Sequence, residues 1–279
     1  MLNDSSANNW YEGTALNKWS YGAGTAEFNG LLDGNGYVIR GIYIKTDLKY
    51  AGLFPRLNYH TTIKNLGIES SYIETTNAHG AAGGLAGSIN PWADGDHIIE
   101  SCYVSDTVTV KSAIYAGGLI GNDEVSVEGR TVRISNCYSA AAIEGSIKAS
   151  LIGFWYYAKG LSVISSYATQ SNLKMLNPGT DTADKHSRLL NNTYFTNCYT
   201  LGVNSIYVNS DNPNYAFSGI TQLTADKITG NEAAVNMVGF KFPRLWYVRA
   251  NEYPVPSVFM HLPPDTVKPT ITGTVSSKT

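Results

Sequence analysis

The stretch FNGLLDGNGYVIRGIYI, residues 28–44, holds two short apolar runs separated by the tetrapeptide Asp33-Gly34-Asn35-Gly36. Pairs of Asn or Asp with Gly tolerate the positive φ that tight turns require, so the tetrapeptide predicts a turn. The second run, residues 37–44, is rich in β-branched side chains and too short for a helix. The stretch therefore predicts a strand, a turn and a second strand.

Two phrases repeat this pattern along the chain. The first is Gly-Leu-x-Gly, whose leucines recur about every 32 residues, a spacing typical of repeat proteins. Its copies are 52–55, where Pro55 replaces the last Gly, 84–87, 118–121, and 150–153, where Ser150 replaces the first Gly. The second phrase is apolar-x-polar-small-Tyr, found at 99–103, 134–138, 164–167 and 195–199, with an earlier form at 63–66.

This period and the strand-like composition select one architecture. Helical repeats need ten or more residues of helical periodicity in each unit, and the repeats supply none. Propeller blades need about four strands and a longer period. We therefore predict an all-β fold, a right-handed parallel β-helix of about five coils in which equivalent residues form ladders about 4.8 Å apart.

The order of these phrases resembles that of the GLUG-motif proteins. The shared features are F-x-G-x-L-D-G-x-G from Phe28, then G-L-F, I-x-N-L, and G-G-L-x-G alternating with I-x-N-C-Y up to Tyr199. The resemblance implies a right-handed β-helix in a secreted bacterial protein, as one module among several at the cell surface. It implies no catalytic motif. Pro55, Ser150 and Ser166, which stands where the phrase has Cys, depart from the pattern and suggest irregular later coils.

The chain divides into four predicted parts. Residues 1–27, with their aromatic side chains, are expected to cap the first coil, and 28–206 form the repeats. Residues 207–260 are expected to seal the last coil with a short helix and a Trp-bearing strand. Residues 261–279 are Pro-rich and read as a linker that resembles the start of an Ig-like module. No apolar signal region opens the sequence, and we expect that a secretion signal has been trimmed.

Composition limits the function classes. Only 15% of residues are charged and the net charge is −2, which gives no electrostatic basis for binding nucleic acid. No run of 18 or more apolar residues predicts membrane insertion by this segment. The low charge with many glycines and tyrosines is typical of an exported β-rich protein, and we expect an extracellular or cell-surface location.

The cysteines and tyrosines of the second phrase should each form a ladder. Cys102, Cys137 and Cys198 hold the same position, so they are interpreted as small buried side chains, with a disulfide between Cys102 and Cys137 as the alternative. The tyrosines point either into the core or outward as a strip for glycan stacking, and we favour structural stacking. Their positions are Tyr103, Tyr138, Tyr167 and Tyr199.

Corner loops after each Gly-Leu-x-Gly should stack on one edge of the solenoid. They bring together carboxylates and flat aromatic side chains, a combination that suits sugar binding. The candidate ligand-binding residues are Trp92, Trp155, Tyr156, Tyr157 and Glu128, next to the carboxylates Asp94, Asp96, Asp123 and Glu124. Alternatively, the loops are solvated and their aromatics pack on their own coil. The long polar run 171–192 is an excursion that is either a lid or simply mobile.

Metal and catalytic roles carry weaker signals. Asp94 and Asp96 could share a Ca²⁺, but no complete calcium loop is present, and no other cofactor is expected. An enzyme would need Asp94 or Asp96 to face Asp123 or Glu124 as a glycosidase pair. A lyase would use a basic group, for which Arg130, Arg133 and Lys159 are the candidates.

We therefore predict a non-catalytic extracellular module of a bacterial surface protein. It would act as an adhesin or spacer and contact polysaccharide, or a host or cell-surface protein, beside the flanking domains of its own chain. The alternative is a secreted polysaccharide-degrading enzyme, a hydrolase or lyase, with its carboxylates on the stacked loops. A stalk that binds protein through its flank is a third alternative.

Overall fold

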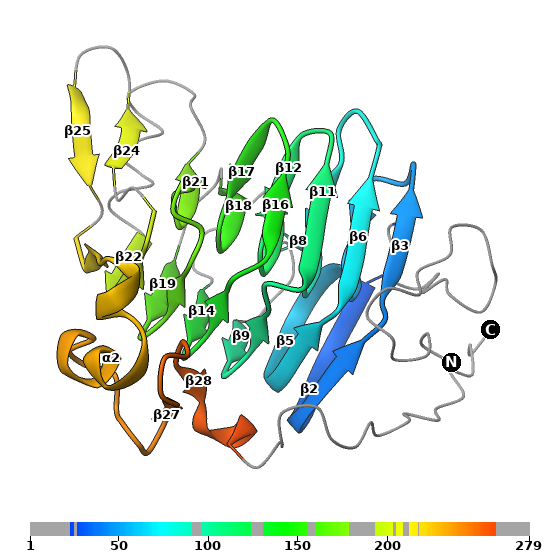
Figure 1. Cartoon of the computed structure of the whole chain (residues 1–279). Helices are drawn as coiled ribbons and strands as arrows, with labels where there is room; N and C mark the ends of the chain where they lie inside the picture. The colour runs from blue at the N-terminus through cyan, green and yellow to red at the C-terminus, as the bar shows by residue number, and fades with distance from the viewer. Residues whose placement is uncertain are drawn as a thin grey trace.

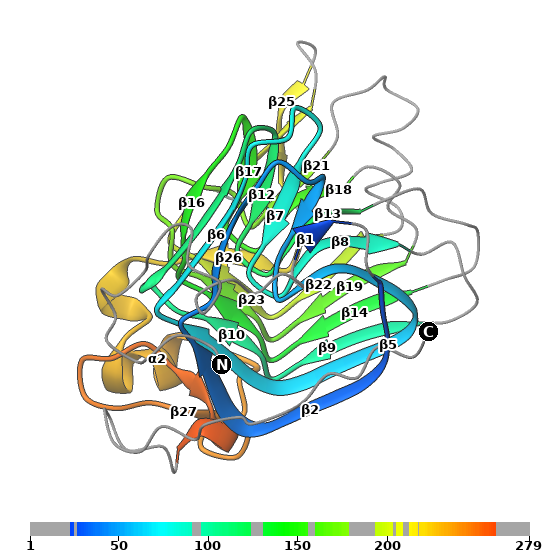
Figure 2. The ribbon, with the colours of Figure 1, turned by 90° about the vertical axis from the view of Figure 1, so that its right-hand side faces the viewer.

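The computed structural model is a parallel β-solenoid, in which strands of successive coils lie side by side (Figure 1) and superimpose in the view of Figure 2. It describes residues 23–24, 27–90, 96–123, 131–155, 160–178, 193–202, 205–208, 212–216 and 218–260. The predicted all-β parallel solenoid is confirmed. The predicted cap at 1–27 and linker at 261–279 lie almost entirely outside the described residues.

Each coil contributes strands to three faces. The first two coils comprise β2 (Glu27–Arg40), β3 (Tyr43–Thr46), β4 (Tyr50–Ala51), β5 (Phe54–Glu69), β6 (Ser71–Thr75) and β7 (Ala81–Gly83). The third comprises β8 (Ala86–Asn90), β9 (His97–Glu100), β10 (Tyr103–Val104), β11 (Val108–Ser112) and β12 (Tyr115–Gly117). The fourth comprises β13 (Ile120–Asp123), β14 (Val132–Ser135), β15 (Tyr138–Ser139), β16 (Ala142–Glu144) and β17 (Ile147–Ala149).

The later part of the solenoid is less regular. It comprises β18 (Ile152–Trp155), β19 (Leu161–Ile164), β20 (Tyr167–Ala168), β21 (Leu176–Pro178), β22 (Thr193–Thr196), β23 (Cys198–Thr200) and β26 (Ile220–Gln222). Two antiparallel additions are β1 (Ala23–Gly24), which pairs with β4, and the hairpin of β24 (Ser205–Val208) and β25 (Asn212–Ala216).

The number of complete turns is about four rather than five. The face made of β3, β6, β11 and β16 has four strands, because residues 169–175 contribute no strand that would stack on β16. Beyond β20 the chain extends only the ladders that run through β18 and β21, β19 and β22, and β20 and β23. The last copy of Gly-Leu-x-Gly, residues 150–153, predicts a fifth coil. The segment that follows it lacks the strands that would complete that coil.

A left-handed residue recurs at one corner of every coil. Asn65, Ser101, Asn136, Ser165 and Asn197 hold equivalent positions, each two residues before a ladder Tyr or, for Asn65, before Gly67, which pairs with Tyr103; their φ angles lie between 46° and 55°. Asn reaches this conformation at lower cost than most residues, because its short polar side chain can bond locally. This requirement explains why the phrase keeps a small polar residue before its Cys and Tyr. In the first coil the predicted turn provides the bend, with φ of 49° at Asn35 and 79° at Gly36.

The cysteines form the predicted internal ladder. Cys102, Cys137 and Cys198 are free thiols and are fully buried, so the alternative disulfide does not form in this structure. Ser166 occupies the missing Cys position: its Oγ accepts a bond from Cys137 N at 3.1 Å and donates to Ile164 O at 2.9 Å. A buried hydroxyl with both bonds satisfied replaces a thiol at little cost. The predicted irregularity at Ser166 is therefore absent.

The tyrosine ladder faces outward from the solenoid interior but is covered. The rings of Tyr103, Tyr138 and Tyr167 stack with centroids 4.9 Å apart, following the registers of β10, β15 and β20. They belong to a second hydrophobic core, separate from the one inside the coils. Tyr199, the last tyrosine of the ladder, is only 5% exposed and is therefore covered as well. Structural stacking is confirmed, and the column offers no free surface to a glycan.

Residues 223–260, here called the flank segment, provide the cover. The segment contains η3 (Ala225–Lys227), α2 (Gly230–Asn236), β27 (Trp246–Tyr247), β28 (Val255–Pro256) and η4 (Ser257–Phe259). The predicted short helix is present. However, the segment lies along the side of the solenoid rather than over its last coil, as Figure 1 shows for α2, β27 and β28. Its position follows from the tyrosine column, whose apolar area would otherwise face water.

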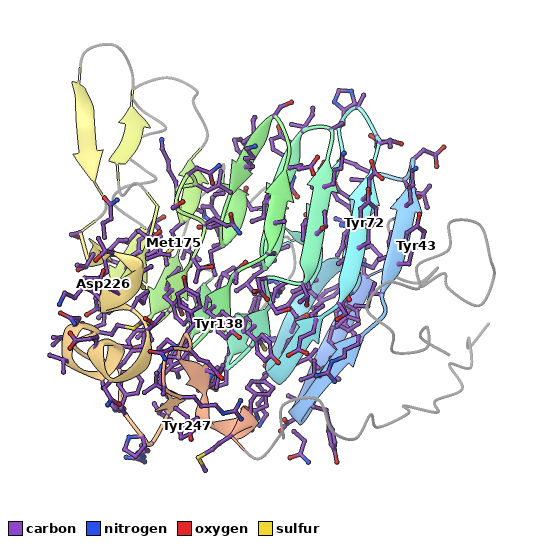
Figure 3. The ribbon with its side chains drawn as sticks, in the orientation of Figure 1. Tyr43, Tyr72, Tyr138, Met175, Asp226 and Tyr247 are labelled. Carbon is purple, nitrogen blue, oxygen red and sulfur yellow. The ribbon has the colours of Figure 1, made fainter. Side chains whose placement is uncertain are left out.

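Replacing the middle ring should test the ladder. Tyr138, labelled in Figure 3, lies between Tyr103 and Tyr167 and is 7% exposed. Tyr138→Ala should lower the free energy of unfolding by about 3 kcal/mol or more, the usual cost of removing a buried ring. Tyr138→Phe keeps the ring and should cost less than about 1.5 kcal/mol. Urea unfolding measures both, and equal losses would contradict a role for ring packing.

The left-handed corner gives a second test. At Asn136, with φ 53°, a β-branched side chain is strained whereas glycine is not. Asn136→Val should therefore be less stable than Asn136→Gly by about 1–2 kcal/mol or more. Thr109→Val, in the extended strand β11, is the matched control and should have little effect. Thermal unfolding measures the order, and a valine variant as stable as the glycine variant would refute this backbone role.

High pH should weaken the fold. Burial raises the pKa of Cys198 to about 12 and also raises the pKa of Cys137 and Tyr138. In the unfolded chain a thiol loses its proton at about pH 8.5, whereas the buried thiol of the folded chain stays protonated. Above that pH, ionisation therefore stabilises the unfolded state relative to the folded state. The free energy of unfolding should be constant below about pH 8.5 and fall as the pH rises toward 12.

Urea unfolding between pH 7 and 11 measures this fall. Cys198→Ala should reduce the slope, and Ellman's reagent should leave all three thiols unmodified until urea is added. Rapid modification of the native chain would show that the thiols are accessible.

Candidate binding edge

Four corner segments are anchored in register on one edge of the solenoid. On one side lie the ends of β8, β13, β18 and β21, and on the other lie the starts of β9, β14, β19 and β22. The stacking is direct: Ile89 pairs with Asp123, and His97 pairs with Val132, which pairs with Leu161. We call the edge at which these strands end and start the loop edge. The segments between these strands, 91–95, 124–130, 156–159 and 179–192, lie outside the described residues.

The first two coils show short forms of the same corner, with one residue, Asn29, between the paired positions in the first coil and three, 58–60, in the second. There β5 continues through the edge without interruption, bending at Tyr59, which has φ 51° and is 49% exposed. The hydroxyl of Thr61 donates to Asn58 O at 2.7 Å and closes the bend. The third and later coils insert extra residues at this position. The loop edge is therefore where the solenoid accepts insertions without losing its register.

Buried polar side chains collect at this edge. His97 and Thr193 take the same interior position as Val132 and Leu161, and Asp123 pairs with Ile89. Along the neighbouring column, Ser88 aligns with Asn122. The polar residues with 7% exposure or less here are Asn58, Thr61, Ser88, His97, Asn122, Asp123 and Thr193. Elsewhere the interior of the described coils is mainly apolar.

Four buried polar atoms at this edge have no hydrogen-bond partner among the described residues. They are Asn58 Oδ1, Asn122 Oδ1, Thr193 Oγ1 and the indole Nε1 of Trp155. A buried polar atom without a partner costs about 1–3 kcal/mol, so such atoms usually meet water or a ligand. Other such atoms, the Tyr50 hydroxyl, Ser139 Oγ and Trp246 Nε1, lie elsewhere in the described chain, but four belong to this edge, which is therefore the candidate binding site.

The predicted carboxylates divide between two environments. Asp96 is exposed, and its Oδ1 accepts a bond from Thr131 N at 3.1 Å, joining the third coil to the fourth. Asp123 is only 4% exposed and occupies an interior position. One of the two carboxylates therefore faces water, and the other lies within the fold. Asp94, Glu124 and Glu128 lie outside the described residues, as does Arg130.

The predicted aromatic platform is only partly described. Trp155 is 2% exposed and belongs to the interior core, so its ring packs on its own coil instead of facing a ligand. This agrees with the alternative interpretation of the loop aromatics. Trp92, Tyr156 and Tyr157 lie outside the described residues, and so does Lys159. Among the predicted basic groups, Arg133 is exposed on β14.

The described chemistry shows no ready nucleophile or metal centre. The described thiols are buried, and burial raises the pKa of Cys137 and Cys198, so they remain protonated at neutral pH. Within the described ranges, no group of three or more His, Cys, Asp or Glu side chains is arranged to hold a metal ion. No helix among the described residues is long and apolar enough to cross a membrane.

Sequence reasoning overlooked the polar interior of this edge. Asn122, Thr193 and His97 are not among the predicted site residues. Aligning the residues after each Gly-Leu-x-Gly would have placed Asp123 beside Ile89, and aligning the starts of the next strands would have placed His97 beside Val132. A polar residue in a column of aliphatic residues was the available signal.

Comparison with known proteins supports the fold alone. No family model matches the chain, and no curated protein matches it. Among solved structures, the chain is similar to the crystal structure of a "putative immunoglobulin A1 protease" from Bacteroides ovatus. The TM-score is 0.54 at 18% sequence identity, and the alignment covers 90% of this chain and 83% of that one. At this identity the likeness extends to the β-solenoid architecture and not to an activity.

Proposed function

We propose that this chain is a non-catalytic extracellular module of a bacterial surface protein, which binds an extended glycan along the loop edge. The observation that supports it is the group of buried amide and hydroxyl atoms without described partners at Asn58, Asn122 and Thr193. Amides and hydroxyls are suited to the hydroxyl groups of sugars, because each can donate or accept. The GLUG-like repeat order supports a cell-surface location.

The regular stacking of the edge favours an extended ligand over a compact one. Equivalent positions recur about every 4.8 Å along the solenoid, so a ligand that follows the edge meets successive coils. The tyrosine column cannot provide this surface, since the flank segment covers it. Asp96, exposed at the same edge, would add a hydrogen-bond acceptor beside the ligand, and it remains a weak Ca²⁺ candidate with Asp94.

A polysaccharide-degrading enzyme is the second candidate. Its supporting observation is that Asp96 and Asp123 belong to adjacent coils at the same edge, where a glycosidase would place its acid and its nucleophile or base. Asp123 is 4% exposed whereas Asp96 faces water, so the two carboxylates lie in different environments. The similar structure from Bacteroides ovatus is named as a protease, and no described residue supports that activity in this chain.

Binding and product release can be measured together on a polysaccharide array. Asn122→Leu removes the amide from the edge but keeps the volume, and should weaken glycan retention about fivefold to tenfold, which corresponds to one hydrogen bond of about 1–1.4 kcal/mol. Its thermal stability should stay equal or rise, because the buried Oδ1 has no described partner. The matched control Gln222→Leu, exposed on β26, should change neither.

The outcomes separate the two candidates. Released oligosaccharide that disappears in Asp123→Asn and Asp96→Asn would establish an enzyme and overturn the non-catalytic proposal. Retention unaffected by Asn122→Leu, together with a lower melting temperature, would make Asn122 a purely structural residue. Retention of no glycan by the unmodified chain would refute glycan binding at this edge.

A further inference from the structure

Both ends of the described chain lie on the first coil. At the beginning, Ala23 pairs with Ala51 and Gly24 pairs with Tyr50, which places β1 on β4. At the end, η4 packs against β2. The approach is close: a Cβ at Gly36 would lie 2.7 Å from the carbonyl oxygen of Val258. The chain therefore enters and leaves the solenoid at the same coil.

The flank segment makes this possible by running back along the whole solenoid. Phe240 contacts Tyr199 in the last coil, with centroids 5.5 Å apart. Further on, Trp246 meets Tyr167 at 5.6 Å, and Phe259 meets Tyr103 at 4.8 Å. The chain thus passes the tyrosines in the reverse of their order in the sequence. In Figure 1 this path leads from α2 past β27 and β28 toward β2.

The flank segment runs back over a definite distance along the solenoid and is held in place by hydrogen bonds. The ladder from Val38 through Gly67, Tyr103, Tyr138 and Tyr167 to Tyr199 has five register steps of about 4.8 Å, or about 24 Å. Hydrogen bonds hold the segment on the way: the Tyr199 hydroxyl donates to Val238 O at 2.8 Å, and the Tyr167 hydroxyl donates to Pro254 O. A segment fixed at several coils cannot swing freely from the last one.

We infer that the solenoid is a side arm, joined to adjoining polypeptide at the first coil and carrying its last coil as the free tip. Any polypeptide before residue 23 and after residue 260 starts from the same end, so the length of the solenoid does not add to the distance between them. The module therefore presents the loop edge outward from its attachment point. On this inference the module does not act as an in-line spacer.

Exposed apolar side chains occur toward both ends of the described solenoid. Leu31, Tyr37 and Leu48 lie on the first coil with exposures of 65%, 46% and 49%, and Tyr194, Val235 and Val238 lie toward the other end with exposures of 60%, 70% and 71%. The described strands of the third and fourth coils have no exposed large apolar side chain.

Spin-label distances in the full chain test this geometry. Native thiols are buried, so nitroxides can be attached to introduced cysteines at exposed positions. In one double variant, Leu31→Cys with Met260→Cys, both labels lie at the base. In the matched variant, Gln222→Cys with Met260→Cys, one label lies at the tip and the other at the base. The second distance should exceed the first by roughly 10–20 Å, because Gln222 lies on the last strand of the ladder about six steps from the first coil.

Two results would overturn the side arm. The first is a Met260 label as close to Gln222 as to Leu31, and the second is a broad base-to-base distribution, which would mean that the flank segment is not fixed. Neither distance depends on a ligand, so the test stands apart from glycan binding. Thermal unfolding of both double variants should match the unmodified chain, because all the positions are exposed.

Discussion

The parallel hydrogen-bond register between coils is the constraint on which the other features depend. It requires each coil to return to the same position, and the left-handed residue at Asn65, Ser101 and their equivalents provides the bend that makes this return possible. Extra residues are accepted where they leave the register intact, mainly at the loop edge and to a smaller extent at the corner before β7, where 76–80 stand against 113–114. A regular framework and a variable edge thus have one physical origin, and the candidate binding site is placed where the framework permits variation.

The same register builds a second core outside the first. Stacking of the tyrosine rings at 4.9 Å follows from the spacing of the strands that carry them, and the flank segment is needed because those rings face outward. Position along the phrase therefore decides the fate of each side chain. Its Cys enters the interior, its Tyr enters the second core, and the residues after Gly-Leu-x-Gly reach the loop edge.

Much of this could be predicted from residues 28–199, because the repeated phrases carry the register in their spacing. The solenoid and both ladders followed from that spacing, and the short helix followed from the helix-forming composition after residue 223. The flank segment did not, since its place depends on which distant surface it buries, and Phe240 or Trp246 could equally have sealed an end. The burial of Asp123 and Trp155 was not predicted for a different reason. At a corner, the alternation of residues along the strand does not tell which side chain points inward.

The return path of the flank segment also changes how the molecule should come apart. In a simple solenoid each coil touches only its neighbours, so unfolding can start at an end and proceed coil by coil. Here one segment contacts the first coil through Val258, middle coils through Phe259 and Trp246, and the last through Phe240. Fraying at either end must first detach that segment from all of them. The coils should therefore melt as one cooperative unit, although their repeats alone would allow stepwise loss.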